Sequence, residues 1–248
     1  MIEILDVYKS FNGNPILKGV TFTVREGELL ALIGRSGIGK SVLLRHIAGL
    51  MKPDSGTIKI NGTDIYKLRG RELVRIREQF GFLFQGGALF DSLTVYDNVA
   101  FPLRERTSLL ESQIKDRVFN ELTHMGMKDD WNKYPAELSG GMRKRAALAR
   151  ALVMGPSIML FDEPTTGLDP IIGQSILDYI HQCHRELKFT AVMVTHEVQK
   201  VFNIVQKVAM IHQGEILVCD SPEALQQQNN PIFDQFVRGD SKGPVQYI

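Results

Sequence analysis

Near its start, the chain alternates apolar and polar residues in the manner of short strands. Residues 2–7 and 20–24 are rich in β-branched side chains, and turn-forming residues at 13–15 separate them. This pattern predicts an opening β-hairpin. Residues 56–65 alternate in the same way around an Asn-Gly pair, so we expect a small antiparallel sheet in this part of the chain.

Further along, short apolar runs alternate with segments whose apolar residues recur at helical spacing. Strands are predicted at 28–34, 80–85, 158–163 and 190–197. After the first of these runs we expect a loop and then a helix that starts at Lys40, and another helix is expected over about 171–187. Strands that alternate with helices form a parallel sheet, in which ligands bind beyond the carboxyl ends of the strands.

Helical patterns dominate residues 86–155, which separate two strand-rich parts of the chain. We therefore predict an α/β fold with a parallel-sheet core and an antiparallel β subdomain over 1–85 and 156–220. An inserted α-helical subdomain covers 86–155, and a C-terminal extension covers 221–248. A chain of 248 residues is long enough to bury a core of its own.

Composition limits the classes of partner. The 29 basic and 28 acidic residues nearly cancel, so no net field favours nucleic acid or an anionic membrane as the main ligand. The apolar runs are far shorter than the roughly 20 residues of a membrane-spanning helix, and the start does not resemble a secretory signal. We expect a cytosolic protein that needs a separate subunit for any membrane role. Cys183 and Cys219 are well separated, which disfavours a disulfide framework or a zinc site.

The segment GRSGIGKS fits the phosphate-loop pattern G-x-x-x-x-G-K-[ST] and lies between a predicted strand and a predicted helix, as that pattern requires. Glycines let consecutive N–H groups point at an anion, and the following helix adds the positive end of its dipole. Lys40 supplies charge for the β- and γ-phosphates, and the Ser41 hydroxyl is a ligand for Mg²⁺. The predicted nucleotide-binding residues are Gly34, Arg35, Ser36, Gly37, Ile38, Gly39, Lys40, Ser41 and Val42.

Two adjacent acids, Asp162 and Glu163, end one of the apolar runs. A buried strand that ends in Asp162 can hold the Mg²⁺ shell, and Glu163 can take the proton of an attacking water. The pair therefore favours hydrolysis over binding alone. Viewed singly, this run is equally compatible with an ordinary strand end.

The segment LSGGM, 138–142, indicates a second anion site. Ser139, Gly140 and Gly141 precede a helix predicted to begin near Met142, and the N–H groups of a helix start attract anions. Because one loop already surrounds the triphosphate, we expect this helix start to meet the phosphate held by a second copy of the chain. An ordinary capped helix is the alternative when the stretch is viewed in isolation.

In combination, these elements resemble the nucleotide-binding subunit of an ATP-binding cassette (ABC) transporter, over nearly the whole chain. The resemblance rests on the order and spacing of Phe11, GRSGIGKS, Gln85 in FLFQ, LSGGM, LFDE, GLDP at 167–170 and His196 in VTHE. The family implies a P-loop NTPase (RecA-like) core, ATP and Mg²⁺ as cofactors, and a homodimer that holds two ATP molecules.

The resemblance also implies a role for each residue, although each taken singly has an ordinary structural explanation. Phe11 stacks on adenine, and Gln85 joins the Mg²⁺ and the water to the surface that contacts the transporter. Asp169 crosses to the partner subunit, and His196 senses the γ-phosphate. The family usually has glutamine after Ser-Gly-Gly, whereas this chain has Met142. We expect the change to spare the site, because the serine hydroxyl and backbone N–H groups make most of the phosphate contacts.

A finer resemblance is carried by residues 83–105, by SGGMRKRAALARAL and by the closing RGDSKGPVQYI. These are similar to the ATPases of Mce-associated, Mla-type transporters, which move phospholipids between bacterial membranes. That family implies permease subunits, an Mce-type substrate-binding protein and often a small STAS-domain partner, with the ATPase peripheral on the cytoplasmic face of the inner membrane. Residues 86–105 would line a groove for a helix of the permease. The tail 236–248 either packs on the other ATPase chain or frays.

Three other classes stay open. The ATPase of a small-solute importer, for example for amino acids, would share every catalytic residue, and only the groove segment and Met142 favour the lipid class. A soluble ABC protein of DNA repair or translation is disfavoured, because the chain has no long coiled-coil insertion and only one cassette. A regulatory module without hydrolysis is disfavoured by the intact Lys40, Asp162 and Glu163.

Overall fold

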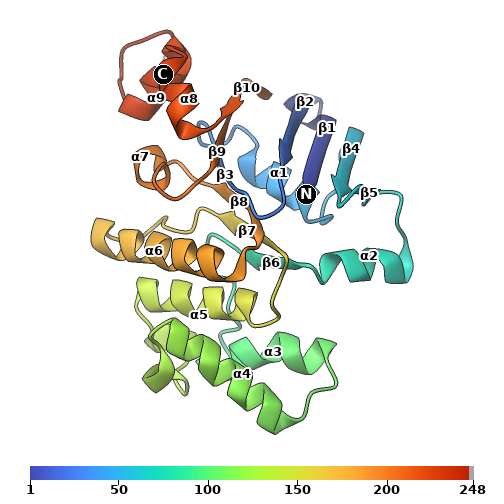
Figure 1. Ribbon diagram of the computed structural model, residues 1–248, viewed down its shortest axis with the longest axis vertical. Coiled ribbons are helices and arrows are strands. Elements are labelled where there is room, and N and C mark those ends of the chain that lie inside the picture. The colour runs from blue at the N-terminus through green and yellow to red at the C-terminus, as the bar shows by residue number, and fades with distance from the viewer. Residues whose placement is uncertain (246–248) are drawn as a thin grey trace. The chain divides into compact units, whose positions relative to one another are not determined.

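The computed structural model describes residues 1–245, and Figure 1 shows its ribbon. Residues 246–248, the end of the predicted C-terminal extension, lie outside the described residues. The chain divides into two compact units, one of Met1–Arg77 with the chain from Thr190 on, and one of Glu78–Phe189. These limits differ from those of the subdomains given above, which stay a prediction.

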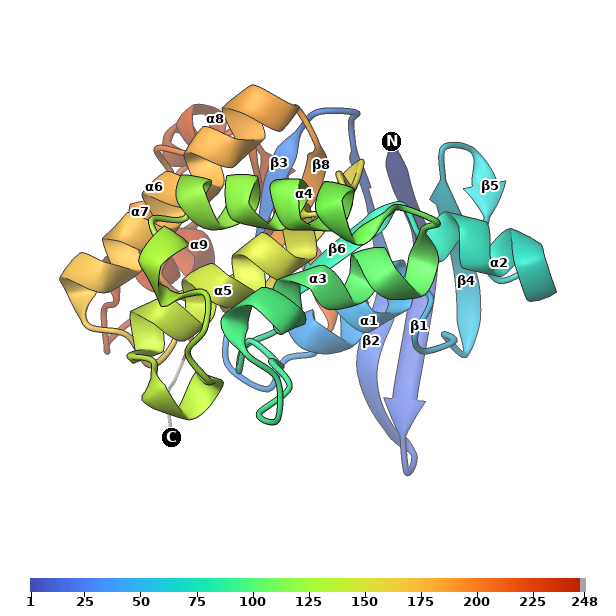
Figure 2. The ribbon, with the colours of Figure 1, turned by 90° about the horizontal axis from the view of Figure 1, so that it is seen from below.

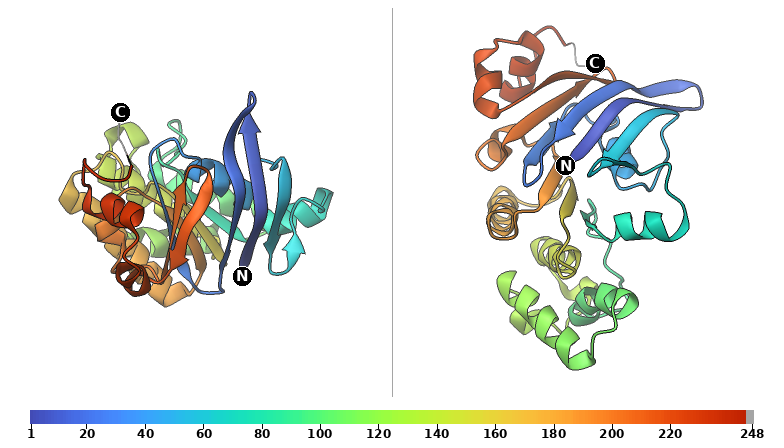
Figure 3. Two further views of the ribbon diagram at one scale, coloured as in Figure 1. Left: turned by 90° about the horizontal axis from the view of Figure 1, so that it is seen from above. Right: turned by 45° about the vertical axis from the view of Figure 1, so that its right-hand side comes forward.

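The first unit opens with an antiparallel sheet in the order β2-β1-β4-β5, whose first strands lie side by side in Figure 3. Its strands are β1 (Ile2–Phe11), β2 (Asn14–Val24), β4 (Ser55–Ile60) and β5 (Thr63–Asp64). Ile2 is paired with Val24 on one side and with Ile60 on the other. The predicted hairpin and antiparallel sheet are confirmed. The strands of the hairpin are longer than the apolar pattern indicated, because pairing continues into their exposed, more polar ends.

In the same unit, β3 (Leu29–Ile33) lies between β8 (Thr190–Val194) and β9 (Lys207–His212) and is parallel to both. The strand β10 (Glu215–Asp220) extends this sheet antiparallel to β9. Every residue of β3 and β8 is buried, which is why both read as uninterrupted apolar runs. Because β3 and β8 are parallel, the loops that follow them leave the same edge of the sheet.

The helices of the first unit follow its strands. They are α1 (Lys40–Ile47), α2 (Gly70–Arg77), α7 (Val198–Val201), α8 (Pro222–Gln227) and α9 (Pro231–Arg238). The order β3, loop, α1 confirms the predicted strand, loop and helix. The helices α8 and α9 lie next to each other beyond β10 (Figures 1 and 3), so the predicted extension is helical where the structure describes it.

The second unit combines two parallel strands with a group of helices. Its strands are β6 (Phe80–Leu83) and β7 (Ile158–Asp162), and its α-helices are α3 (Val95–Arg106), α4 (Glu111–His124), α5 (Gly140–Leu152) and α6 (Pro170–Leu187). Short 3₁₀ turns are formed by Lys128–Asp130 and Pro135–Glu137. The helix α5 packs against α3, α4 and α6, and Figure 2 shows it next to α3 and α4.

Most helices of the two units bury apolar side chains, and α2 is an exception with no buried residue. On α5, for example, Ala146, Ala149 and Leu152 are buried. Across residues 1–245, we find no helix with the length and apolar character that crossing a membrane requires.

Candidate functional site

The phosphate loop connects β3 to α1 and needs glycine at specific positions. Gly34, Gly37 and Gly39 have φ of 145°, 78° and 108°, a region that other residues rarely adopt. A Cβ on Gly34 would lie 2.5 Å from the carbonyl oxygen of Ile211, and one on Gly39 would lie 2.6 Å from Cγ2 of Ile16. Around Gly37, by contrast, no atom of the described residues other than its chain neighbours lies within 4 Å of the Cβ position. The loop is therefore closely packed at both ends and open in its middle.

Lys40 closes the loop from inside. Its side chain is buried, and Nζ donates hydrogen bonds to the carbonyl oxygens of Gly34 (2.7 Å) and Arg35 (2.9 Å). The N-cap of α1 is Gly39, which makes no side-chain capping hydrogen bond, so no side chain of the N-cap competes with a phosphate for the first N–H groups of the helix. The curled loop, its cation and the glycine-capped helix fit a nucleotide triphosphate.

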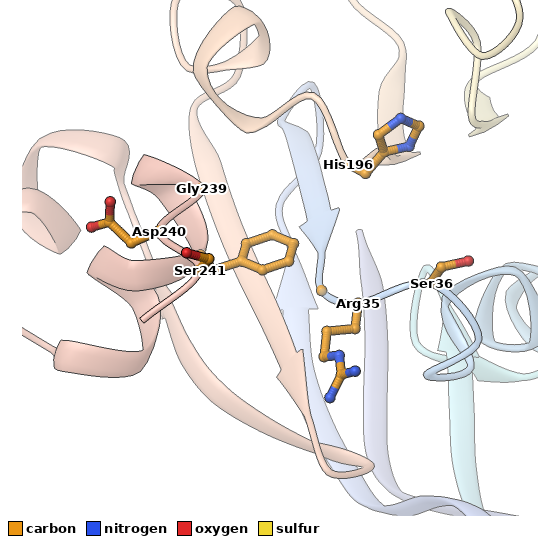
Figure 4. A pocket seen from close by; sticks show the side chains of 8 residues that line it. Arg35, Ser36, His196, Gly239, Asp240 and Ser241 are labelled. Atoms are coloured by element: carbon orange, nitrogen blue, oxygen red, sulfur yellow. The ribbon is translucent and has the colours of Figure 1, made fainter. Parts of the chain in front are cut away.

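His196 belongs to the same unit as the phosphate loop and shares a cavity with it. It follows β8, whose carboxyl end lies at the same edge as that of β3. The cavity has a volume of about 560 Å³ and is lined by Gly34, Arg35, Ser36, His196, Phe236, Gly239, Asp240 and Ser241. Figure 4 shows the labelled members arriving from the loop after β3, the loop after β8 and the chain after α9. The structure thus brings His196 to the loop, as a γ-phosphate sensor requires.

The sequence did not predict that residues 236–241 line this cavity. They are held by Gln235, which is 4% exposed and whose Nε2 donates to the carbonyl oxygens of Asp240 (3.1 Å) and Val245 (2.9 Å). Val245 N–H donates back to Oε1 of Gln235 (2.9 Å). A polar residue within an amphipathic segment was the only signal available. Packing of the tail on a second ATPase chain stays a prediction, and its last residues, 246–248, are outside the described range.

Phe11 lies at the end of β1 and is 40% exposed. The ammonium of Lys9 lies 5.3 Å from the centre of its ring. An aromatic side chain with an exposed ring suits stacking on a planar base. The adenine-stacking role of Phe11 remains a prediction.

The second unit carries the acid pair at the end of β7. Asp162, the last residue of the strand, is 7% exposed. Glu163 follows with φ of 51°, and its Oε2 accepts a hydrogen bond from the Thr166 hydroxyl (3.1 Å). A non-glycine residue with positive φ is uncommon and is often found at functional sites. The turn thus fixes the direction of the Glu163 carboxylate.

Gln85 lies near the acid pair through the pairing of β6 with β7. Leu83, the last residue of β6, is in register with Phe161, so Gln85 and Glu163 follow two adjacent strand ends. The strand is shorter than the predicted 80–85, because the chain turns at 84–87 with a hydrogen bond from Gly87 N–H to the carbonyl of Phe84 (2.8 Å). The structure therefore brings together Gln85, Asp162 and Glu163, as the sequence predicted.

Lys144 of α5 joins this group and was missed by sequence reasoning. Its Nζ donates to the carbonyl oxygen of Gln85 and to that of Glu163 (3.3 Å). Burial lowers the pKa of the Lys144 ammonium, while the carboxylates of Asp162 and Glu163 oppose that shift. In the sequence, Lys144 stands between Arg143 and Arg145 at the start of a helical segment, and nothing in the pattern distinguished it from a solvated basic residue.

The start of α5 is at the surface. The Ser139 hydroxyl accepts a hydrogen bond from Met142 N–H (3.2 Å). The helix begins at Gly140, close to the start predicted near Met142, and Ser139 is its N-cap. A Cβ on Gly141 would lie 2.5 Å from Cγ2 of Ile172 on α6, so glycine permits the close approach of these two helices.

Asp169 caps the neighbouring helix α6. Its Oδ1 accepts hydrogen bonds from the N–H groups of Ile171 (3.1 Å) and Ile172 (3.0 Å). Gly140 lies beside this turn, because its Cβ position is 3.1 Å from Leu168. The structure therefore places Ser139, Gly140 and Asp169 in one surface region of the second unit, whereas Gly141 is buried against Ile172.

An aromatic groove of about 270 Å³ also lies in the second unit. Segment 86–105, which was predicted to line a groove, contributes Phe90, Phe101, Pro102 and Glu105. The other lining residues come from 80–84, from the end of α3 and from 150–154. The rings of Phe90 and Phe101 lie 4.9 Å apart, and both are partly exposed. Such a surface suits an apolar segment of another protein.

A parallel strand followed by a glycine loop, a buried lysine and a helix start without a side-chain cap defines a P-loop nucleotide-binding protein. The chain belongs to the ABC transporter family, whose model, described as "ABC transporter", matches residues 17–166. It is an ABC-type ATPase, the ATP-binding and ATP-hydrolysing component of a transporter.

Known proteins similar to the chain come from several organisms. "Probable ribonucleotide transport ATP-binding protein mkl" of Mycobacterium tuberculosis is 42% identical over 244 residues, which are 98% of this chain and 68% of that protein. "Intermembrane phospholipid transport system ATP-binding protein MlaF" of Haemophilus influenzae is 38% identical over 100% of this chain and 94% of its own. Among solved structures, a dimeric ATP-binding cassette in a post-hydrolysis state with ADP and phosphate has a TM-score of 0.82 and 31% identity, covering 89% of this chain and 98% of that one. The predicted fold class is thereby confirmed.

Proposed function

We propose that this ATPase drives the transport of phospholipids between bacterial membranes. The observation that carries the proposal is the 38% identity to a phospholipid transport ATPase over the full length of this chain and nearly the full length of the relative. The relative named for ribonucleotide transport has a higher identity, 42%, but this chain covers only 68% of its length. Met142 and the groove segment support the lipid class.

We propose that the nucleotide is ATP with Mg²⁺ and that the predicted residues divide the work. The phosphate loop and Lys40 bind the phosphates, and His196 contacts the γ-phosphate. Ser41, Gln85 and Asp162 are the proposed ligands of the magnesium ion, because hydroxyl, amide and carboxylate oxygens are the ligands it prefers. When bound, that ion neutralises charge on the phosphates. Glu163 takes the proton of the attacking water, helped by the fixed direction of its carboxylate.

The active form is proposed to be a homodimer around two ATP molecules. Ser139, Gly140 and Asp169 lie together at the surface, and the buried Gly141 follows Gly140 in the first turn of α5. The nucleotide of a second copy can reach this helix start. The dimeric state of the similar cassette supports this assembly. ATP closes the pair because its γ-phosphate is bound from both chains, and hydrolysis reopens it.

The membrane partners are proposed to be permease subunits, with an apolar permease segment in the aromatic groove. The chain would act as a peripheral protein on the cytoplasmic face of the inner membrane. An Mce-type substrate-binding protein and a small STAS-domain protein complete the proposed assembly. Nucleic acid is not among the partners proposed, since the charges of the chain nearly cancel.

The Glu163→Gln variant tests the hydrolytic part of the proposal. The amide cannot accept the proton, so we expect turnover to fall about 100-fold or more while ATP binding persists. Size-exclusion chromatography with ATP should reveal a trapped dimer. The exposed Glu26→Gln serves as a matched control and should leave turnover unchanged. Undiminished turnover in Glu163→Gln would remove this residue from the role of base.

Reconstitution with the native permease tests the lipid part. We expect mass spectrometry of the purified complex to find bound phospholipid, and ATP-dependent transfer of lipid between vesicles to stop in Glu163→Gln. If an amino acid or a ribonucleotide stimulated ATP turnover in place of lipid, the assignment of phospholipid as the transported substrate would be wrong. The assignment of the chain as an ATPase would stand. Recovery of ribosomes or DNA with the chain, without a membrane protein, would instead favour a soluble ABC protein.

A further inference from the structure

The helix α5 holds the main chain that follows β6 through two basic side chains. Lys144 Nζ donates to the carbonyl oxygen of Gln85. Arg150 donates to the carbonyls of Gly87 (2.9 Å) and Ala88 (2.7 Å). Gly87 has φ of 77°, and its Cβ position is 3.3 Å from Cβ of Ala147, so the segment approaches the helix as closely as glycine allows.

Lys144 also reaches the acid pair. Its ammonium lies 3.3 Å from the carbonyl oxygen of Glu163. That residue has the positive φ noted above, and its carboxylate is bound by Thr166. A single side chain of α5 therefore holds the backbone of the proposed base and that of Gln85.

Burying the Lys144 ammonium destabilises the fold unless hydrogen bonds and nearby carboxylates compensate. The side chain of Lys144 is 5% exposed, and its neighbours Ala146, Ala147 and Leu148 are fully buried. Burying an ammonium costs several kcal/mol before its partners compensate, and an apolar residue packs a helix as well or better. The packing of α5 alone thus does not explain the lysine, whereas two carbonyl partners and the adjacent carboxylates do.

We propose that Lys144 is a positioning residue for ATP hydrolysis, whose ammonium fixes the backbones of Gln85 and Glu163 to the helix that Ser139 caps. The inference rests on the proposed roles of Gln85 and Glu163. If α5 shifts when its start contacts a phosphate, we expect Gln85 and Glu163 to move with it. Lys144 itself contacts no reacting atom.

The test compares three variants in the full chain assembled with its permease. Lys144→Met removes the ammonium and keeps a long unbranched side chain, whereas Lys144→Arg keeps the charge and the donors. Lys115→Met removes the same charge from an exposed position of α4 and serves as the control. We expect Lys144→Met to lower kcat about 10-fold or more, since small misplacements of catalytic groups have effects of this size. The Kd for MgATP and the KM should stay within about twofold, because the phosphate loop is untouched.

Lys144→Arg should recover most of the lost kcat, and the control should match the unmodified protein. A merely structural lysine would instead lower Tm, kcat and MgATP affinity together, with no recovery in Lys144→Arg, and this result would overturn the inference. So would a kcat in Lys144→Met of half the original value or more. If Lys144→Met does not fold, Lys144→Gln replaces it, and equal kcat in Lys144→Gln and Lys144→Arg would overturn the inference.

Glu163→Gln, measured beside these variants, separates this inference from the proposed function. If Glu163→Gln is inactive and Lys144→Met is fully active, only the role of Lys144 fails. If Glu163→Gln keeps its turnover, Glu163 is not the base, and the proposed function itself is wrong at this residue.

Discussion

The helices α1 and α5 are both proposed to meet a phosphate, yet their first turns are built differently. The N-cap of α1 is Gly39, with φ of 108° and no side-chain capping bond. The N-cap of α5 is Ser139, in extended conformation, and its hydroxyl accepts a hydrogen bond from Met142 N–H. The first helix start lies behind a curled loop with a buried lysine, and the second lies at the surface.

The difference suits two kinds of binding. A glycine cap leaves the first N–H groups to the ligand, so the start of α1 is most favourable when a phosphate is present. A serine cap stabilises its helix by about 1 kcal/mol without any ligand. The start of α5 is therefore ordered before it meets a nucleotide, which suits a surface that touches ATP only when a second copy arrives.

The largest expected effect comes from Lys40→Ala at the start of α1. The variant removes the cation that closes the loop, and we expect nucleotide affinity to fall about 100-fold or more. Calorimetry with ATP measures the loss. The exposed Lys67→Ala is the control, because it removes the same charge outside the loop. Unchanged affinity in Lys40→Ala would contradict the phosphate-loop assignment.

At the start of α5, Ser139→Ala separates capping from phosphate contact. Ser221 caps α8 with a bond of the same length, 3.2 Å to Ala224 N–H, so Ser221→Ala is a matched control. Both variants should lower the free energy of unfolding by about 1 kcal/mol. Only Ser139→Ala should lower turnover, by about 10-fold, with ATP affinity of the separate chain unchanged. Equal turnover in the two variants would reduce Ser139 to an ordinary cap.

Two glycines of the loop sharpen the comparison further. Alanine at either position must adopt a positive φ, which costs about 1 kcal/mol. At Gly39 the new Cβ also meets Ile16, whereas at Gly37 it meets open space. Urea unfolding should therefore find Gly39→Ala less stable than Gly37→Ala by about 1 kcal/mol or more. Equal stabilities would mean that the loop relaxes away from Ile16.

The smallest expected effect is that of Met142→Gln in the first turn of α5. It introduces the residue usual in the family, but Met142 contributes its N–H to the serine cap through the backbone. Turnover measured at saturating ATP should change less than about twofold, well below the effect of the Ser139 variant. A larger gain would assign the side chain at this position a part in binding.

The phosphate loop could be predicted from the sequence because its chemistry is local. Positive φ at three positions within six residues demands glycine, and the lysine and the serine must follow at fixed distances. The strands that precede Asp162 and His196 could also be predicted from the sequence, since buried parallel strands are continuous apolar runs. The limits of elements were less certain: β6 ends before Gln85, and α5 begins before Met142.

The sequence by itself determined the order of the strands up to 194, the phosphate loop and the family to which the chain belongs, because these depend on spacing along the chain. Only the tertiary structure decided that Lys144 holds the carbonyls of Gln85 and Glu163, and that Gln235 holds the tail beside Arg35. A lysine or a glutamine in a helical segment has no partner that its neighbours in sequence can specify. The partner is fixed when folding buries the side chain, because a buried polar group must find a hydrogen bond among whatever backbone the fold brings to it.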